Sequence, residues 1–110
     1  HHAQLMFREM VEPTRALDRV VSEFIRPAAR ELEDIVQQML GPGFTPQERQ
    51  HAGLSVVSQI LHYKHCRAVI VRLFPKLPVD ASQIDTLTQH VTRFSLAALR
   101  GLRREKWRRS

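Results

Sequence analysis

The chain has 110 residues, which is enough for one domain with a modest core. Hydrophobic residues make up 43% of the sequence, which argues against disorder, and no apolar run approaches the roughly 20 residues that span a bilayer. The single cysteine, Cys66, excludes a disulfide framework within one chain and fits the reducing cytoplasm, where we expect this protein.

The net charge of +6 is concentrated at the C-terminus. Segment 100–110 holds six of the 17 Lys and Arg residues and one acidic residue, Glu105, so it carries +5 by itself. One interpretation is an arm that attracts phosphate groups. The other is a solvated helix end whose cations oppose the negative pole of the helix dipole. We favour the second, because Trp107 is the only aromatic residue among these cations.

Nearly every segment has helical periodicity, and no strand-like alternation appears. A first helix is predicted over about residues 2–12, ending before Pro13. A second is predicted over about residues 15–40, where apolar residues three and four positions apart form one stripe. Pro27 lies inside this helix, so we expect a kink or local break near Phe24.

Strong stop and start signals follow the second helix. Gly41-Pro42-Gly43 predicts a glycine-capped helix end, and Thr45-Pro46-Gln47-Glu48 predicts a capping box with proline at the first helical position. The third helix is predicted to reach about His65 and to continue or bend through Phe74. Its middle is apolar on more than one side, so we expect it to pack against two neighbours.

The last helix is predicted over about residues 81–104, with Asp80 as N-cap and Gln83 completing a second capping box. Apolar and small residues recur along it in steps of three and four, which is typical of a packing seam. The last two helices are expected to form an antiparallel hairpin. Their apolar surface exceeds what one chain covers, so a second copy is expected to cover it.

The sharpest chemical cluster is His62, His65 and Cys66, whose imidazole and thiolate groups suit zinc, with His90 as a conceivable fourth ligand. The alternative is a set of ordinary polar residues near a helix end. We predict no metal and no cofactor, because the spacing matches no standard ligand set. No catalytic residue and no enzyme activity are predicted, since the sequence contains no nucleophile elbow and no glycine-rich phosphate loop.

Several polar residues lie among apolar ones in the first and third helices, including Arg8, Glu12, Gln59, His62 and Tyr63. An apolar cavity with a few polar groups is what a small-molecule pocket requires. The same pattern also fits a packed core with polar residues at its edge.

Four segments together resemble the C-terminal domain of TetR-family transcription regulators, in the CecR-type subgroup. They are Arg8-Glu9-Met10-Val11-Glu12-Pro13-Thr14, Ile25-Arg26-Pro27, Ser55-Val56-Val57-Ser58-Gln59 with Tyr63, and His90-Val91-Thr92-Arg93-Phe94-Ser95-Leu96. The resemblance covers about residues 5–102. It implies that residues 1–110 form one all-α regulatory domain. The last two helices would pair with those of a second subunit in a four-helix bundle, and the earlier helices would enclose an effector pocket.

The resemblance also implies roles for individual residues. Ligand-binding roles fall on Phe7, Arg8, Met10, Glu12, Phe24, Gln59, His62 and Tyr63. Dimer-interface roles fall on Val57, Leu61, Ile84, Leu87, Val91, Phe94, Ala98 and Leu102. The seam in the last helix supports the dimer set independently.

The implied partners are a second copy of the chain and a small-molecule effector whose identity the sequence does not reveal; no membrane partner is expected. The helix-turn-helix domain of such regulators is not in this sequence, so DNA is expected to bind only through that missing N-terminal domain. The alternative function is a helical interaction module whose basic C-terminal tail binds nucleic acid or an anionic surface.

Overall fold

The computed structural model describes residues 15–109, and this part of the chain is helical and contains no strand. This confirms the predicted all-α class. Its elements are α2 (Arg15–Val20), η1 (Val21–Ile25), α3 (Arg26–Leu40), α4 (Pro46–His65), α5 (Arg67–Leu73), η2 (Ala81–Gln83) and α6 (Ile84–Arg109). The first predicted helix, at residues 2–12, lies outside the described residues.

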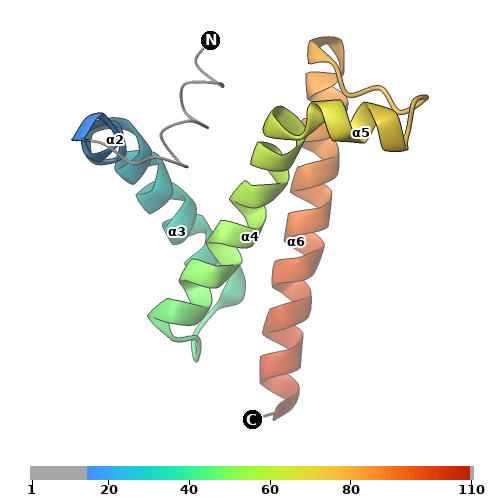
Figure 1. The fold of residues 1–110 in the computed structure, drawn as a ribbon. Coiled ribbons are helices and arrows are strands. Elements are labelled where there is room, and N and C mark those ends of the chain that lie inside the picture. Colours follow the sequence, from blue (N-terminus) through green and yellow to red (C-terminus); the bar gives the residue numbers. More distant parts are fainter. Residues whose placement is uncertain (1–14, 110) are drawn as a thin grey trace.

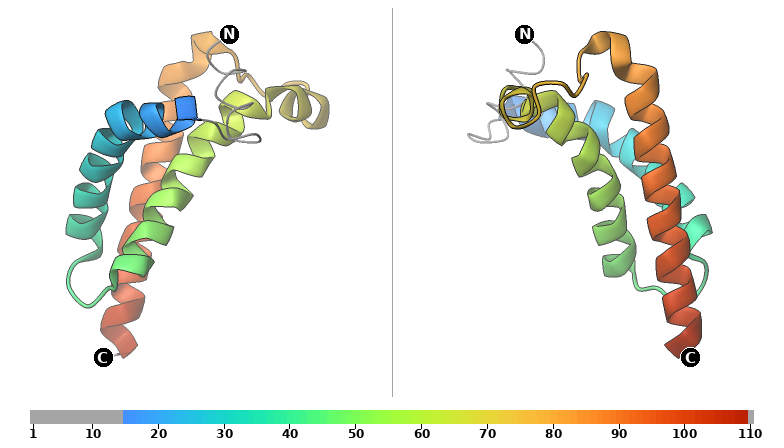
Figure 2. Two further views of the ribbon diagram at one scale, coloured as in Figure 1. Left: turned by 60° about the vertical axis from the view of Figure 1, so that its left-hand side comes forward. Right: turned by 90° about the vertical axis from the view of Figure 1, so that its right-hand side faces the viewer.

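Three helices form the body of the molecule (Figure 1). α3 packs against both α4 and α6, and α4 also packs against α6 and α5. α4 and α6 run in opposite directions, which confirms the predicted antiparallel pairing (Figure 2). α4 therefore has two long neighbours, as predicted, although none of its residues is fully buried.

The second helix changes direction near Pro27, and Figure 2 shows α2 turned away from the axis of α3. Between them, η1 is a π-helical turn in which the amide of Arg26 donates a hydrogen bond to the carbonyl of Val21, five residues earlier. Proline has no N–H to donate, so the α-helical ladder cannot continue unchanged at this point. The predicted local break near Phe24 is confirmed.

Local sequence signals shape the turn between α3 and α4 as predicted. Gly41 and Gly43 have φ angles of 79° and 91°, which L side chains rarely adopt. The Thr45 hydroxyl accepts a hydrogen bond from the Glu48 amide at 3.1 Å, and the Glu48 carboxylate accepts one from the Thr45 amide at 2.9 Å. Both bonds of the capping box are thus present.

The second predicted capping box is not formed. Asp80 makes no side-chain cap bond; its carboxylate accepts a hydrogen bond from the Ser82 hydroxyl at 2.5 Å. A 3-10 turn occupies Ala81–Gln83 before α6 begins. The prediction was wrong because the nearer hydroxyl of Ser82 engages the carboxylate in place of the Gln83 amide. α6 also continues to Arg109, beyond the predicted end at residue 104, so most of the basic segment is helical.

The core is small and lies where α3 meets α6. Val36, Leu40 and Leu99 are 0%, 1% and 5% exposed, and half-buried apolar residues of α3, α4 and the turn surround them. Many large apolar side chains in the described residues stay exposed, among them Leu54 at 66% and Phe94 at 60%. The described part of one chain therefore leaves apolar surface uncovered on α4 and α6.

Candidate functional site

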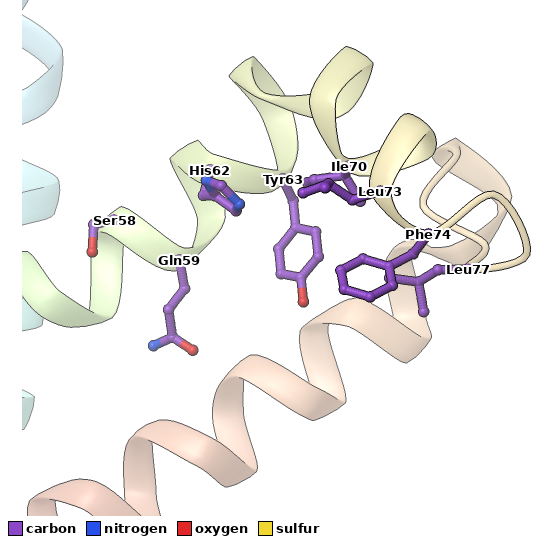
Figure 3. Close-up of a pocket in the computed structure, with 8 residues that line it drawn as sticks. All are labelled: Ser58, Gln59, His62, Tyr63, Ile70, Leu73, Phe74 and Leu77. Atoms are coloured by element: carbon purple, nitrogen blue, oxygen red, sulfur yellow. The ribbon is translucent and has the colours of Figure 1, made fainter.

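An open-sided, mostly apolar pocket of about 520 Å³, here called the cavity, lies beside the second half of α4 (Figure 3). α4 contributes polar and aromatic side chains, while α5 and the connection after it contribute apolar ones. The lining residues are Ser58, Gln59, His62, Tyr63, Ile70, Leu73, Phe74 and Leu77. No lining residue within the described part of the chain carries a carboxylate, an ammonium or a guanidinium group. Such a wall suits an uncharged, mostly apolar molecule.

The polar groups of the cavity come mainly from one face of α4. Gln59 and Tyr63 both point toward α6 in Figure 3, and the Gln59 amide donates a hydrogen bond to the Ser95 hydroxyl at 3.0 Å. Ser95 is 7% exposed and Gln59 is half-buried, so this bond is partly shielded from water. The rings of His62 and Tyr63 meet edge to face, with centroids 6.2 Å apart. One wall of the cavity is thus bonded directly to α6.

The predicted ligand-binding residues are only partly brought together. Gln59, His62 and Tyr63 line the cavity, whereas Phe24 is 69% exposed on η1 and is not among the lining residues. The other four, Phe7, Arg8, Met10 and Glu12, lie outside the described residues.

Sequence reasoning missed the residues that α5 and the following connection contribute, which are Ile70, Leu73, Phe74 and Leu77. A usable signal existed. The predicted continuation or bend of the third helix through Phe74 is confirmed by α5, but its mostly apolar run from Val69 to Phe74 was not assigned to a pocket.

The predicted dimer-interface residues divide between two surfaces. Ile84, Phe94 and Leu102 are 65%, 60% and 41% exposed, whereas Val91 is only 8% exposed and lies in the chain's own interior. The remaining members, Val57, Leu61, Leu87 and Ala98, are half-buried or exposed.

At 3.6 residues per turn, α6 has two apolar strips side by side. Val91, Ser95 and Leu99 face the interior. A second strip, here named the apolar face of α6, covers about 60° of the helix surface and is accessible to solvent. Its members are Leu87, Phe94, Ala98 and Gly101. A Cβ placed on Gly101 would meet no atom within 4 Å, so the described part of the chain leaves space for a neighbour there.

An ion pair and a cation–π contact connect the C-terminal end of α6 to the start of α4 and the turn before it. Lys106 Nζ lies 3.8 Å from Glu48 Oε1 and 5.4 Å from the centroid of the Phe44 ring. The hydrogen bond from the Thr45 amide is the largest influence on the Glu48 carboxyl and lowers its pKa. Desolvation opposes this shift, and the charge of Lys106 and the Thr45 hydroxyl lower the pKa by smaller amounts. Both contacts hold the helix end close to the α3–α4 turn.

Among the described residues, His62, His65 and Cys66 do not assemble into a metal site with other side chains. Within residues 15–109, no group of three or more His, Cys, Asp or Glu side chains is placed to hold a metal ion. His90, the fourth ligand considered from the sequence, lies beside Phe94 instead, with the two ring centroids 5.9 Å apart. No helix of the described residues has the length and apolar character needed to cross a membrane.

Comparison with known families identifies a match over most of the chain. The family model for the C-terminal domain of the HTH-type transcriptional dual regulator CecR matches residues 1–99. No curated protein and no solved structure matches the chain.

Proposed function

Because the chain belongs to the family of CecR C-terminal domains, we propose that it senses a small molecule and joins two subunits of a transcriptional regulator. The observation that carries this proposal is the hydrogen bond between Gln59 and Ser95. Gln59 lines the cavity, and Ser95 lies on α6 next to Phe94, an exposed member of its apolar face. The bond therefore joins a ligand pocket to a helix that can bind a second subunit.

The cavity supports the sensing role. Its apolar residues cover one side of a ligand, while the Gln59 side-chain amide and the Tyr63 hydroxyl are placed to fix the ligand's orientation. The effector is an uncharged, largely apolar molecule, because a buried charge would lack an opposite charge in this wall.

The Gln59–Ser95 bond gives the effector a route to α6. A ligand that accepts a hydrogen bond from the Gln59 amide competes with Ser95 for the same donor. The regulator then has two arrangements, one with the Gln59–Ser95 bond formed and one with it broken. The effector binds the second more tightly, which is the requirement for a ligand to shift the populations of the two. In the intact regulator, this shift would move the DNA-binding domains of the two subunits relative to each other.

The apolar face of α6 supports the dimer role. It presents Phe94 beside the small residues Ala98 and Gly101, which allow another helix to approach closely. Two copies of this face, one from each chain, form a closed symmetric contact.

Light scattering after size-exclusion chromatography tests the dimer. We expect a mass near twice the 12.8 kDa of one chain, and a single-chain mass for Phe94→Glu, which places a charge in the contact. Trp107→Glu is the matched control, since Trp107 is 81% exposed but lies off the apolar face. A wild-type monomer at every concentration, or a Phe94→Glu dimer, would remove the dimer from the proposal.

A further inference from the structure

A row of arginines follows the solvent side of α6. Arg93, Arg100, Arg104 and Arg108 are all exposed and lie within about 80° of one another around the helix axis. This arginine stripe extends over about 22 Å at 1.5 Å per residue. It lies on the side of the helix opposite Ser95, which faces the interior.

Other cations at the same helix end have structural contacts, and the stripe is distinct from them. Lys106 pairs with Glu48, Arg109 pairs with Glu105 at 2.9 Å, and the Arg103 guanidinium lies over Gly41. None of the ion pairs found in residues 15–109 involves the stripe. Asp85 and Glu105 are the acidic residues of α6, and Glu105 is engaged by Arg109. The stripe therefore presents positive charge that its own helix does not neutralise.

We propose that the arginine stripe binds the phosphate backbone of duplex DNA, in place of the solvated helix end that the sequence favoured and in addition to binding through a separate N-terminal domain. Duplex DNA carries one negative charge per about 1.7 Å of its axis, so an extended row of cations can contact several phosphates at once. Arginine donates two parallel hydrogen bonds to a phosphate and remains charged at any physiological pH. This contact goes beyond the proposed sensing role and adds to any DNA contact made by a separate DNA-binding domain.

The surroundings of the stripe favour duplex DNA over two other anionic partners. Single-stranded nucleic acid is bound by rows of aromatic side chains, and Trp107 is the one aromatic residue beside the stripe. A helix that lies on a membrane inserts apolar side chains next to its cations. On α6 the centre of the apolar face lies about 100° from the centre of the stripe. In the proposed dimer a second copy covers that face, which leaves no apolar side chains to insert into a membrane beside the stripe.

Fluorescence anisotropy with a short labelled duplex tests the proposal on the 110-residue chain. With four phosphate contacts, we expect affinity to fall about 100-fold between about 50 and 200 mM salt. Replacing the four stripe arginines with glutamine should weaken binding at least about tenfold at the lower salt concentration and flatten the salt dependence. The matched control replaces Arg15, Arg26, Arg30 and Arg67 with glutamine, which changes the net charge equally and should weaken binding much less.

Equal losses in the two variants would overturn the proposal, because net charge alone would then explain binding. Absence of wild-type binding at the lower salt concentration would overturn it as well. Two further probes separate the alternatives. Stripe-dependent sedimentation with phosphatidylserine vesicles but no duplex binding would assign the stripe to membranes. Tighter binding to single strands that is lost in Trp107→Ala would assign it to stacking. Circular dichroism of both arginine variants must match the wild type.

Discussion

The two ends of the helical body differ in how tightly they are packed. At the turn end, where α3 meets α4 and α6 finishes, Leu40 and Leu99 are 1% and 5% exposed. At the α5 end, Leu73 and Phe74 line the cavity and stay 66% and 60% exposed. Buried apolar contacts set local stability, and the turn end holds the most deeply buried side chains, Val36 and Leu40, although Ile70 and Val79 are also buried at the α5 end. We therefore expect the turn end to contribute more to stability. In the proposed function, the α5 end keeps apolar surface available for a ligand.

Truncating one leucine at each end gives the largest contrast. Leu40→Ala should lower the free energy of unfolding by about 3 kcal/mol, because it leaves a cavity in the small core. Leu73→Ala should cost less than about 1 kcal/mol, since Leu73 already faces solvent. Urea unfolding followed by circular dichroism measures both values. Similar losses would contradict the assignment of stability to the turn end.

The turn end was predictable because its signals are local. Gly41 and Gly43 supply the backbone angles, and Thr45 with Glu48 closes the capping box within four consecutive residues. The effect of Pro27 is also local, because its missing N–H interrupts the backbone hydrogen bonds of the helix that contains it. Asp80 shows the limit of such reasoning, because its carboxylate had two nearby donors and the sequence does not rank them.

The candidate site was less predictable because it depends on how separate helices meet. The periodicity of α6 combined Val91 with Phe94 in one seam, yet Val91 faces the interior and Phe94 faces solvent. Two adjacent apolar strips on one helix give a single broad signal, and only packing separates them. The predicted grouping of Phe24 with Tyr63 stays a prediction, because Phe24 is not among the lining residues of this pocket and four of the other predicted members lie outside the described residues.

An apolar dye tests whether the α5 end binds ligands. Nile red is uncharged and fluoresces strongly in apolar surroundings, so its emission should rise on binding the cavity. Phe74→Ala should weaken dye binding about tenfold, because the ring contributes a large part of the wall. Phe24→Ala is the matched control, since Phe24 is 69% exposed and lies away from the cavity. Equal weakening by both substitutions would favour the pocket predicted from sequence.

The smallest effect on the free energy of unfolding is expected from Glu48 at the turn end, and this effect depends on pH. The pKa of Glu48 lies below its ordinary value of 4.5 in the folded chain, so its charged form stabilises the fold above about pH 4.5. That contribution is lost as the pH falls through the lowered pKa. Glu48→Gln keeps an acceptor for the Thr45 amide but removes the charge. Its small deficit in unfolding free energy should therefore be largest near neutral pH and shrink on acidification.

Lys106→Gln separates the two causes of this pKa shift. The Thr45 amide lowers the pKa of Glu48 more than Lys106 does, so most of the pH-dependent difference should survive in the Lys106→Gln background. Urea unfolding at several pH values, with and without Glu48→Gln, gives the comparison. If Lys106→Gln removed the difference entirely, the ion pair between α4 and α6 would be its source. The turn end would then depend on contact between helices, as the α5 end does, and less on the local capping box.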